Sequence, residues 1–155
     1  MIRVRTCVLG AGLAIATCLL APPVHADGLR FGLRGGYYTK AEEPFAGAEL
    51  LVPVAHRLYF NPNVEYVFVN IGSYLTYNAD FHYDFAVDRS TFFWLGGGLA
   101  VVQINPDGPN NGSTDAAANF LAGIGFRTGS AIPYFQAKLV AKSGTEFAVA
   151  FGVRF

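Results

Sequence analysis

The sequence predicts an all-β fold, an eight-stranded antiparallel up-and-down barrel. Eight segments alternate apolar side chains with small or polar ones, and turn-forming residues separate them. No uninterrupted apolar run reaches the roughly 20 residues that a membrane-spanning helix needs. The composition agrees, because the 155 residues include 18 glycines, 8 tyrosines and 14 phenylalanines and only 14% are charged. Aromatic residues favour strands, glycines favour turns, and this length favours a single domain.

The first 26 residues have the organisation of a secretory signal peptide. Two arginines precede an apolar stretch at residues 7–20, and the segment ends on the small residue Ala26. We therefore expect residues 1–26 to direct Sec-type export and to be cleaved, which leaves residues 27–155 as the barrel domain. Cleavage removes both cysteines of the chain, so the mature protein has no disulfide to form.

The first four predicted strands follow directly from the alternation. Residues 29–38 alternate Leu, Phe and Leu with Arg, Gly and Arg, and residues 46–54 set Ala, Leu and Val against Gly and Glu. Residues 58–69 place Leu, Phe, Val and Tyr opposite Tyr, Asn and Glu. Residues 75–85 are the most regular, with six apolar or aromatic residues interleaved with five polar ones. This period of two indicates strands with two unlike faces.

The last four predicted strands show the same period. Residues 91–104 alternate Phe, Leu and Val with Trp, Gly and Ala, although three consecutive glycines at 96–98 leave the facing of this strand open. Residues 117–127 alternate Phe, Ala and Ile with Asn, Gly and Arg, and residues 132–141 alternate Phe, Ala and Leu with Tyr, Gln and Lys. Residues 146–155 alternate Phe and Val with Ala, Gly and Arg.

The connections between these strands differ in kind along the chain. Tight turns are expected at residues 55–57, 88–90 and 128–130. More polar and longer loops are expected at residues 39–45, 70–73, 105–116 and 142–145. Short turns on one rim and longer loops on the other, with both termini on the short-turn rim, are typical of an up-and-down outer-membrane barrel.

Charged residues lie on one face of the predicted strands, and the other face is apolar. An eight-stranded interior is too narrow for eight full sets of Leu and Phe but accepts glycines and paired polar side chains. We therefore expect a transmembrane β-barrel whose apolar face contacts lipid and whose interior holds a charge network. The expected members are Arg30, Arg34, Glu49, Glu65, Asp80, His82, Asp84, Arg127, Lys138 and Arg154. Pairing within this set is the expected use of the charges, because an unpaired charge in a narrow interior is costly.

The end of the chain carries the most specific feature. An alternating last strand closes on an aromatic residue, with Phe147, Val149, Phe151, Val153 and Phe155 on one face. With the signal peptide and eight alternating strands, this resembles the small bacterial outer-membrane β-barrel family of the OmpA/OmpX type. The resemblance implies an outer-membrane location, periplasmic termini, and recognition of this strand by the barrel assembly machinery.

The expected function is structural or surface-interactive. The barrel would act as a rigid scaffold in outer-membrane lipid and present the loops at residues 39–45 and 105–116 to an external ligand of unknown identity. One alternative is a narrow ion-conducting channel, with a path along Arg30, Glu49, Asp80 and Arg154. The other is a soluble exported barrel that binds a small apolar ligand, which requires the apolar face, including Phe81, Phe93 and Leu99, to point inward.

No enzymatic, cofactor or nucleic-acid function is expected. The lipid A deacylase family carries a His-x-Ser pair near its last strands, whereas the final two predicted strands here contain no histidine. Asp80, His82 and Asp84 alternate on one strand face and could ligate a metal, but pairing with Arg30, Arg34 or Arg127 is the expected use. Nine basic residues remain against eleven acidic ones after cleavage, so no basic excess supports nucleic-acid binding.

Overall fold

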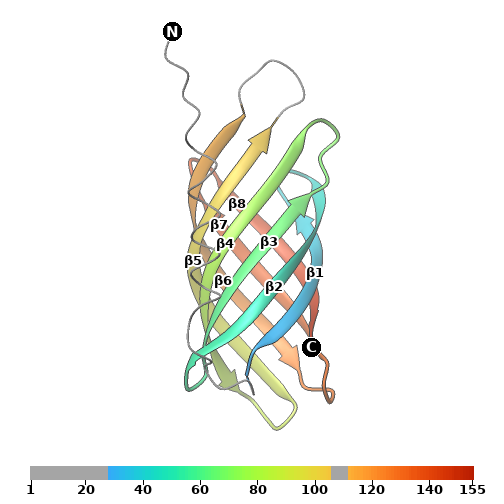
Figure 1. Cartoon of the computed structure of the whole chain (residues 1–155), viewed down its shortest axis with the longest axis vertical. Coiled ribbons are helices and arrows are strands. Elements are labelled where there is room, and N and C mark those ends of the chain that lie inside the picture. The colour runs from blue at the N-terminus through green and yellow to red at the C-terminus, as the bar shows by residue number, and fades with distance from the viewer. Residues whose placement is uncertain (1–27, 106–111) are drawn as a thin grey trace.

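The computed structural model describes residues 28–105 and 112–155, which form a closed antiparallel barrel of eight strands (Figure 1). The strands are Arg30–Tyr38 (β1), Glu43–Ala55 (β2), Leu58–Val67 (β3), Ser73–Ala86 (β4), Thr91–Asn105 (β5), Ser113–Phe126 (β6), Ile132–Ala141 (β7) and Thr145–Arg154 (β8). Each strand pairs with its neighbour in the chain, and β1 pairs with β8 to close the barrel. The predicted fold class is therefore confirmed. The predicted signal peptide, residues 1–26, lies outside the described residues.

The described part of the chain has no helix of the length and hydropathy needed to cross a membrane. The strands tilt around the long axis of the barrel, and closure pairs the backbone of all eight strands (Figure 1). The β2–β3, β4–β5 and β6–β7 turns lie at the lower end in Figure 1, where the C-terminus also lies. We call this end the turn end and the opposite end the loop end.

Side chains alternate between the interior and the outer wall as the period of two predicts. Phe31, Leu33 and Phe135 are about half exposed on the outside, whereas Arg34 and Gln136 are buried inside. Strand β5, whose facing the glycines leave open, points Trp94 inward and its neighbours Phe93 and Leu95 outward. The apolar face therefore forms the outer wall, which a solvated protein would expose to water at high cost and which lipid stabilises.

Two of the predicted loops are shorter than expected. Strand β2 already begins at Glu43, so the first loop covers only residues 39–42. Strand β6 begins at Ser113 and not near 117, because residues 113–116 pair with residues 101–104 of β5. Residues 113–115 are polar because the strands continue beyond the apolar band, and this polarity made them resemble a loop. Within the second predicted loop, residues 106–111 lie outside the described residues.

The interior is layered, which corrects the expectation of a uniformly polar lumen. Near the loop end lies an apolar cluster of Tyr38, Phe45, Val67, Tyr74, Ala100, Val102, Ala117, Val140, Ala148 and Ala150, here the loop-end cluster. Near the turn end lies a second cluster of Phe92, Trp94, Ile132 and Tyr134, here the turn-end cluster. Polar side chains fill the middle between them.

Inward-facing glycines explain how large rings fit inside a narrow barrel. A Cβ at Gly123 would overlap the ring of Trp94, and a Cβ at Gly152 would overlap the ring of Tyr134. A ring on one strand therefore occupies the space that a side chain would fill if the facing residue on the neighbouring strand were not glycine. The interior still does not hold full sets of Leu and Phe, because the few inward rings depend on facing glycines.

Candidate functional site

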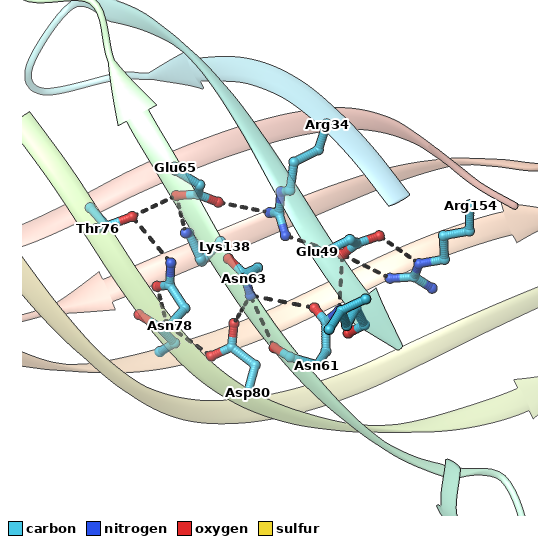
Figure 2. Close-up of polar contacts among 12 residues, drawn as sticks. Arg34, Glu49, Asn61, Asn63, Glu65, Thr76, Asn78, Asp80, Lys138 and Arg154 are labelled. Carbon is cyan, nitrogen blue, oxygen red and sulfur yellow. Dashed lines mark hydrogen bonds and ion pairs between the residues drawn. The ribbon is translucent and has the colours of Figure 1, made fainter. Parts of the chain in front are cut away.

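The middle of the lumen is built around the carboxylate of Glu65 on β3 (Figure 2). Lys138 Nζ donates to its Oε2 at 2.6 Å, and Tyr38 OH donates to the same oxygen at 2.5 Å. Thr76 Oγ1 donates at 3.1 Å, and Arg34 Nη2 lies 3.1 Å from Oε1. Four strands therefore converge on one buried carboxylate, and charge-assisted contacts of this kind are among the stronger hydrogen bonds in proteins.

A second carboxylate, Glu49 on β2, continues the network towards the turn end. Arg154 Nε donates to its Oε1 at 2.7 Å, and Asn61 Nδ2 donates to its Oε2 at 3.1 Å. Arg34 Nη1 lies 3.5 Å from Oε2, so Arg34 bridges Glu49 and Glu65. Three cations and two carboxylates thus form one connected set in the interior, which we call the ion-pair network.

Asp80 lies beside the ion-pair network and is held by amides. Asn63 Nδ2 donates to Oδ2 at 3.0 Å, and Asn119 Nδ2 donates to Oδ1 at 2.8 Å. Asn119 Nδ2 also donates to Asn78 Oδ1 at 2.8 Å. Sequence reasoning did not single out these asparagines, although they alternate with apolar residues and therefore share the inward face with the charged residues.

His82 and Asp84 form a separate pair nearer the turn end. His82 Nδ1 lies 3.0 Å from Asp84 Oδ1, and the imidazole stacks on the ring of Tyr59 with 5.5 Å between centroids. The expectation that Asp80 and Asp84 pair with arginines is therefore wrong. The arginines near the middle, Arg34 and Arg154, pair with glutamates. A glutamate side chain reaches farther into the lumen than an aspartate side chain does.

The remaining two expected members lie at the turn end and outside the ion-pair network. Arg30 Nη1 donates to the carbonyl oxygen of Ser130 at 3.5 Å, across to the β6–β7 turn. The guanidinium of Arg127 lies 4.3 Å from the ring centroid of Phe92. The ten residues predicted as one network thus divide into a central five, Asp80 with its amides, the His82 pair and two rim arginines.

Cation–π contacts join the ion-pair network to both apolar clusters. The Arg154 guanidinium lies 4.9 Å from the Trp94 ring centroid and 4.4 Å from that of Tyr134, in the turn-end cluster. Lys138 Nζ lies 5.5 Å from the ring centroid of Tyr38, in the loop-end cluster. The charges of the ion-pair network therefore face rings or opposite charges.

The histidines and acidic residues are not arranged as a metal site. Across residues 28–105 and 112–155, no group of three or more His, Cys, Asp or Glu side chains is placed to hold a metal ion. His56 is exposed in the β2–β3 turn, whereas His82 lies inside the barrel. Of the three alternating residues on β4, only His82 and Asp84 contact each other.

The predicted assembly signal lies along β8 and just beyond it. Phe147, Val149 and Phe151 point outward and are exposed, and Val153 is half-buried. The ring of Phe155 is exposed, while its backbone N–H donates to the carbonyl oxygen of Phe31 at 2.8 Å.

The barrel is similar to several solved outer-membrane barrels. It matches the N-terminal β-barrel domain of Pseudomonas aeruginosa OprF with a TM-score of 0.64 and 14% identity, over 83% of this chain and 97% of that one. Neisserial surface protein A (NspA) matches with a TM-score of 0.58 and 13% identity, over 82% and 94%. The outer membrane enzyme PagL matches with a TM-score of 0.57 and 17% identity, over 81% and 98%.

No protein-family model and no curated protein sequence matches the chain. At these low identities the structural likeness concerns the fold, and the neighbours include both a surface protein and an enzyme. Strand number, strand order and closure agree with the apolar outer wall and the polar middle of the lumen. The chain therefore has the fold of the small eight-stranded β-barrels of the bacterial outer membrane.

Proposed function

We propose that this protein is an outer-membrane barrel with a structural or surface-interaction role and a lumen closed to solutes. The signal peptide delivers it by Sec-type export, and the turn end with both termini faces the periplasm. The support is the apolar outer wall together with a fold shared with outer-membrane proteins. Outer-membrane lipid is its first partner, since lipid covers the exposed Phe, Leu and Val side chains.

The observation that carries this proposal is the filling of the lumen. A solute that entered from either end would meet an apolar cluster first and the paired charges of Glu49 and Glu65 behind it. Separating buried ion pairs costs several kcal/mol, and an eight-stranded barrel has little room for water beside its side chains. The lumen therefore supports a scaffold better than it supports a channel.

The loop end supports the surface-interaction part of the proposal. A pocket of about 360 Å³ lies between the β1–β2 and β7–β8 connections, lined in part by Lys40, Tyr74, Lys142 and Glu146. Lys142 Nζ lies 5.6 Å from the ring centroid of Tyr74, and the Lys40 backbone N–H donates to Glu146 Oε1 at 2.7 Å. A rigid barrel holds this pocket towards the exterior, where an external ligand has access to it.

The outward facing of the apolar residues argues against a soluble ligand-binding barrel. Phe81, Phe93 and Leu99 would have to line an internal pocket, yet all three lie exposed on the outer wall. An enzymatic role is not proposed either. His82 is buried inside the barrel and stacks on Tyr59, so its imidazole does not face the lipid on which an outer-membrane lipid hydrolase would act.

Fractionation of the expressed protein tests the proposed location. We expect recovery in the outer membrane and a heat-dependent mobility shift on gel electrophoresis. If the assembly machinery recognises the last strand, we expect deletion of Phe155 to lower recovery in the outer membrane. The control Phe120→Leu, a change on the outer wall of β6, is expected to leave recovery unchanged. A soluble periplasmic product without the mobility shift would overturn the proposal.

Planar-bilayer recordings test the closed lumen. We expect the reconstituted protein to show no discrete conductance, and we expect Asp80→Asn to be equally silent because Asp80 is held by amides and does not lie in an open path. Discrete steps that change on Asp80→Asn would favour the ion-channel alternative.

A further inference from the structure

The two ends of the barrel carry opposite charge. Within the described residues, the turn end holds four arginines, Arg30, Arg57, Arg89 and Arg127, and its turns hold a single acidic residue, Asp88. The loop end holds two lysines, Lys40 and Lys142, against four acidic residues, Glu42, Glu43, Asp115 and Glu146. The turn end is therefore basic and the loop end acidic, although the whole chain has no net charge.

The arginines are spread around the turn end, with one in or next to each of the three turns. Arg57 lies in the β2–β3 turn, Arg89 in the β4–β5 turn and Arg127 directly after β6, and all three are exposed. Asp88 does not pair with Arg89, because its carboxylate accepts hydrogen bonds from the backbone N–H groups of Ser90 and Thr91, each at 2.7 Å. The Arg127 guanidinium lies against the ring of the buried Phe92. Arg57 and Arg89 lie in turns beyond the strand ends, so these two guanidinium groups are available to an external anion.

An aromatic band on the outer wall lies between these arginines and the middle of the barrel. Phe85 and Phe93 stack with 4.8 Å between ring centroids, and Phe135 and Phe151 lie 5.2 Å apart. Aromatic side chains of membrane proteins gather at the level of the lipid headgroups. We therefore expect the arginines of the turns to lie at the depth of the lipid phosphates.

A groove runs down the outer wall from the aromatic band, with a volume of about 500 Å³. Its small floor residues are Ala122 and Ala137, which pair with each other across β6 and β7. Larger apolar side chains flank them, namely Phe93, Leu95, Ile124, Phe135 and Val149. Phe93, which flanks the groove, follows Arg89 by four residues, or roughly 13 Å along an extended chain. The backbone N–H of Arg127 donates to the carbonyl oxygen of Ser90 at 2.7 Å, so the β4–β5 turn with Arg89 lies beside the end of β6 and within reach of the groove.

We propose that the turn end binds an anionic phospholipid, with its phosphate on Arg89 and one acyl chain in the groove. The guanidinium group matches a phosphate through two parallel N–H donors, and the groove offers the acyl chain an apolar surface. The inference rests on the proposed function, in which this end faces the periplasmic leaflet.

Lipid retention during purification tests the headgroup part. The protein is folded in vesicles of equal parts phosphatidylglycerol and phosphatidylcholine with identical chains, extracted in mild detergent, and its bound lipid is measured by native mass spectrometry. We expect phosphatidylglycerol to be enriched. The variant Arg89→Gln lowers the enrichment by about fivefold, the contribution of one arginine near an anionic surface. The matched variant Lys40→Gln/Lys142→Gln at the loop end keeps it.

Filling the groove tests the acyl-chain part. Ala137→Phe is expected to lower the retention of both lipids while leaving the preference for phosphatidylglycerol, whereas Ala79→Phe, on the outer wall of β4, changes neither. An excess of glycerol 3-phosphate during extraction distinguishes a lipid from a free phosphate, and we expect it to leave the bound lipid in place.

Several outcomes would overturn the inference. They are equal retention of both lipids by the unaltered protein, loss of the preference in the loop-end variant, equal effects of the two phenylalanine substitutions, and displacement of the lipid by glycerol 3-phosphate. Each sample is first checked for the heat-dependent mobility shift. A protein that shows the shift but no lipid preference contradicts only this inference, whereas a protein without the shift contradicts the proposed function.

Discussion

Glu65 is the side chain that joins most strands in the interior. Its carboxylate on β3 contacts Arg34 and Tyr38 on β1, Thr76 on β4 and Lys138 on β7. The side chain is fully buried, and so are the side chains of both cations that face it. A buried ion pair adds little stability compared with apolar residues of the same shape, but removal of one partner leaves an uncompensated charge.

The first prediction follows from this asymmetry. Glu65→Gln removes the negative charge and leaves Arg34 and Lys138 facing each other across the lumen. We expect the free energy of unfolding to fall by about 3–5 kcal/mol, measured by urea-induced unfolding of the barrel folded in phospholipid vesicles. In Glu65→Gln/Lys138→Met one unpaired cation is also removed, so part of the loss is expected to return. Equal stability of Glu65→Gln and the unaltered protein would show that water reaches the network.

A second prediction concerns the space that glycine leaves for a ring. A Cβ at Gly123 would fall within the indole of Trp94, so Gly123→Ala must displace the ring or the strand. We expect a loss of about 1–3 kcal/mol, as for other overpacked interiors, in the same urea experiment. Gly35→Ala is the control, because a Cβ there would lie 3.5 Å from the carbonyl oxygen of Phe45, an ordinary contact. A similar loss in both variants would mean that backbone effects dominate.

At the scale of elements, alternation identified every strand and the facing of all but β5, because lipid outside and a narrow interior impose the same period on all eight strands. The three consecutive glycines of β5 left its facing open. The ends were harder to predict. Ser113, Thr114 and Asp115 look like loop residues, yet they pair with β5 above the apolar band, where a strand no longer needs apolar side chains. Pairing partners across strands depend on register, which the period of two does not give. The pairing of Gly123 with the Trp94 ring therefore could not be predicted.

The sequence predicted which residues form the candidate site better than it predicted which of them contact each other. Arg34, Glu49, Glu65, Lys138 and Arg154 were all expected in the lumen and do meet there. Which cation meets which carboxylate depends on the shear of the barrel, because strand tilt brings residues at different positions along their strands to one level. The asparagines around Asp80 were missed, although they alternate with apolar residues, and this alternation places them on the inward face.

The third prediction concerns the β4–β5 turn. Hydrogen bonds from the backbone N–H groups of Ser90 and Thr91 lower the pKa of the Asp88 carboxyl. A carboxyl with a lower pKa in the folded state stabilises the fold above its unfolded pKa, about 4. That contribution is lost as the pH falls through the folded pKa. We expect Asp88→Asn to be less stable than the unaltered protein at neutral pH, and the difference to vanish in acid.

Unfolding midpoints of both proteins in urea, measured from neutral pH down to about pH 2, give this difference directly. All other acidic groups are common to both proteins, so their contributions cancel in the comparison. Arg89→Gln serves as the control, because it changes a charge in the same turn without removing these hydrogen bonds. A difference between the unaltered protein and Asp88→Asn that persists at the lowest pH would assign the effect to the amide and not to the carboxylate.

At the scale of the whole molecule, the barrel has an apolar outer wall and a polar middle, but apolar clusters also close both ends of the lumen. The apolar clusters keep water away from the ion pairs, and Arg154 and Lys138 connect the pairs to rings at either end. This arrangement gives a rigid support for the loop end and the turn end.

The last prediction tests this inside and outside assignment with the one tryptophan of the chain. Trp94 is buried in the turn-end cluster, while its neighbour Phe93 is 39% exposed on the outer wall. In vesicles of lipids with brominated acyl chains, which quench tryptophan on contact, we expect Trp94 fluorescence to be little quenched. In Phe93→Trp/Trp94→Phe the only tryptophan moves by one residue and changes face, because successive strand residues point to opposite sides. Its fluorescence should be strongly quenched. The reverse order of quenching would turn every strand inside out and make the Phe and Leu face the interior of a soluble barrel.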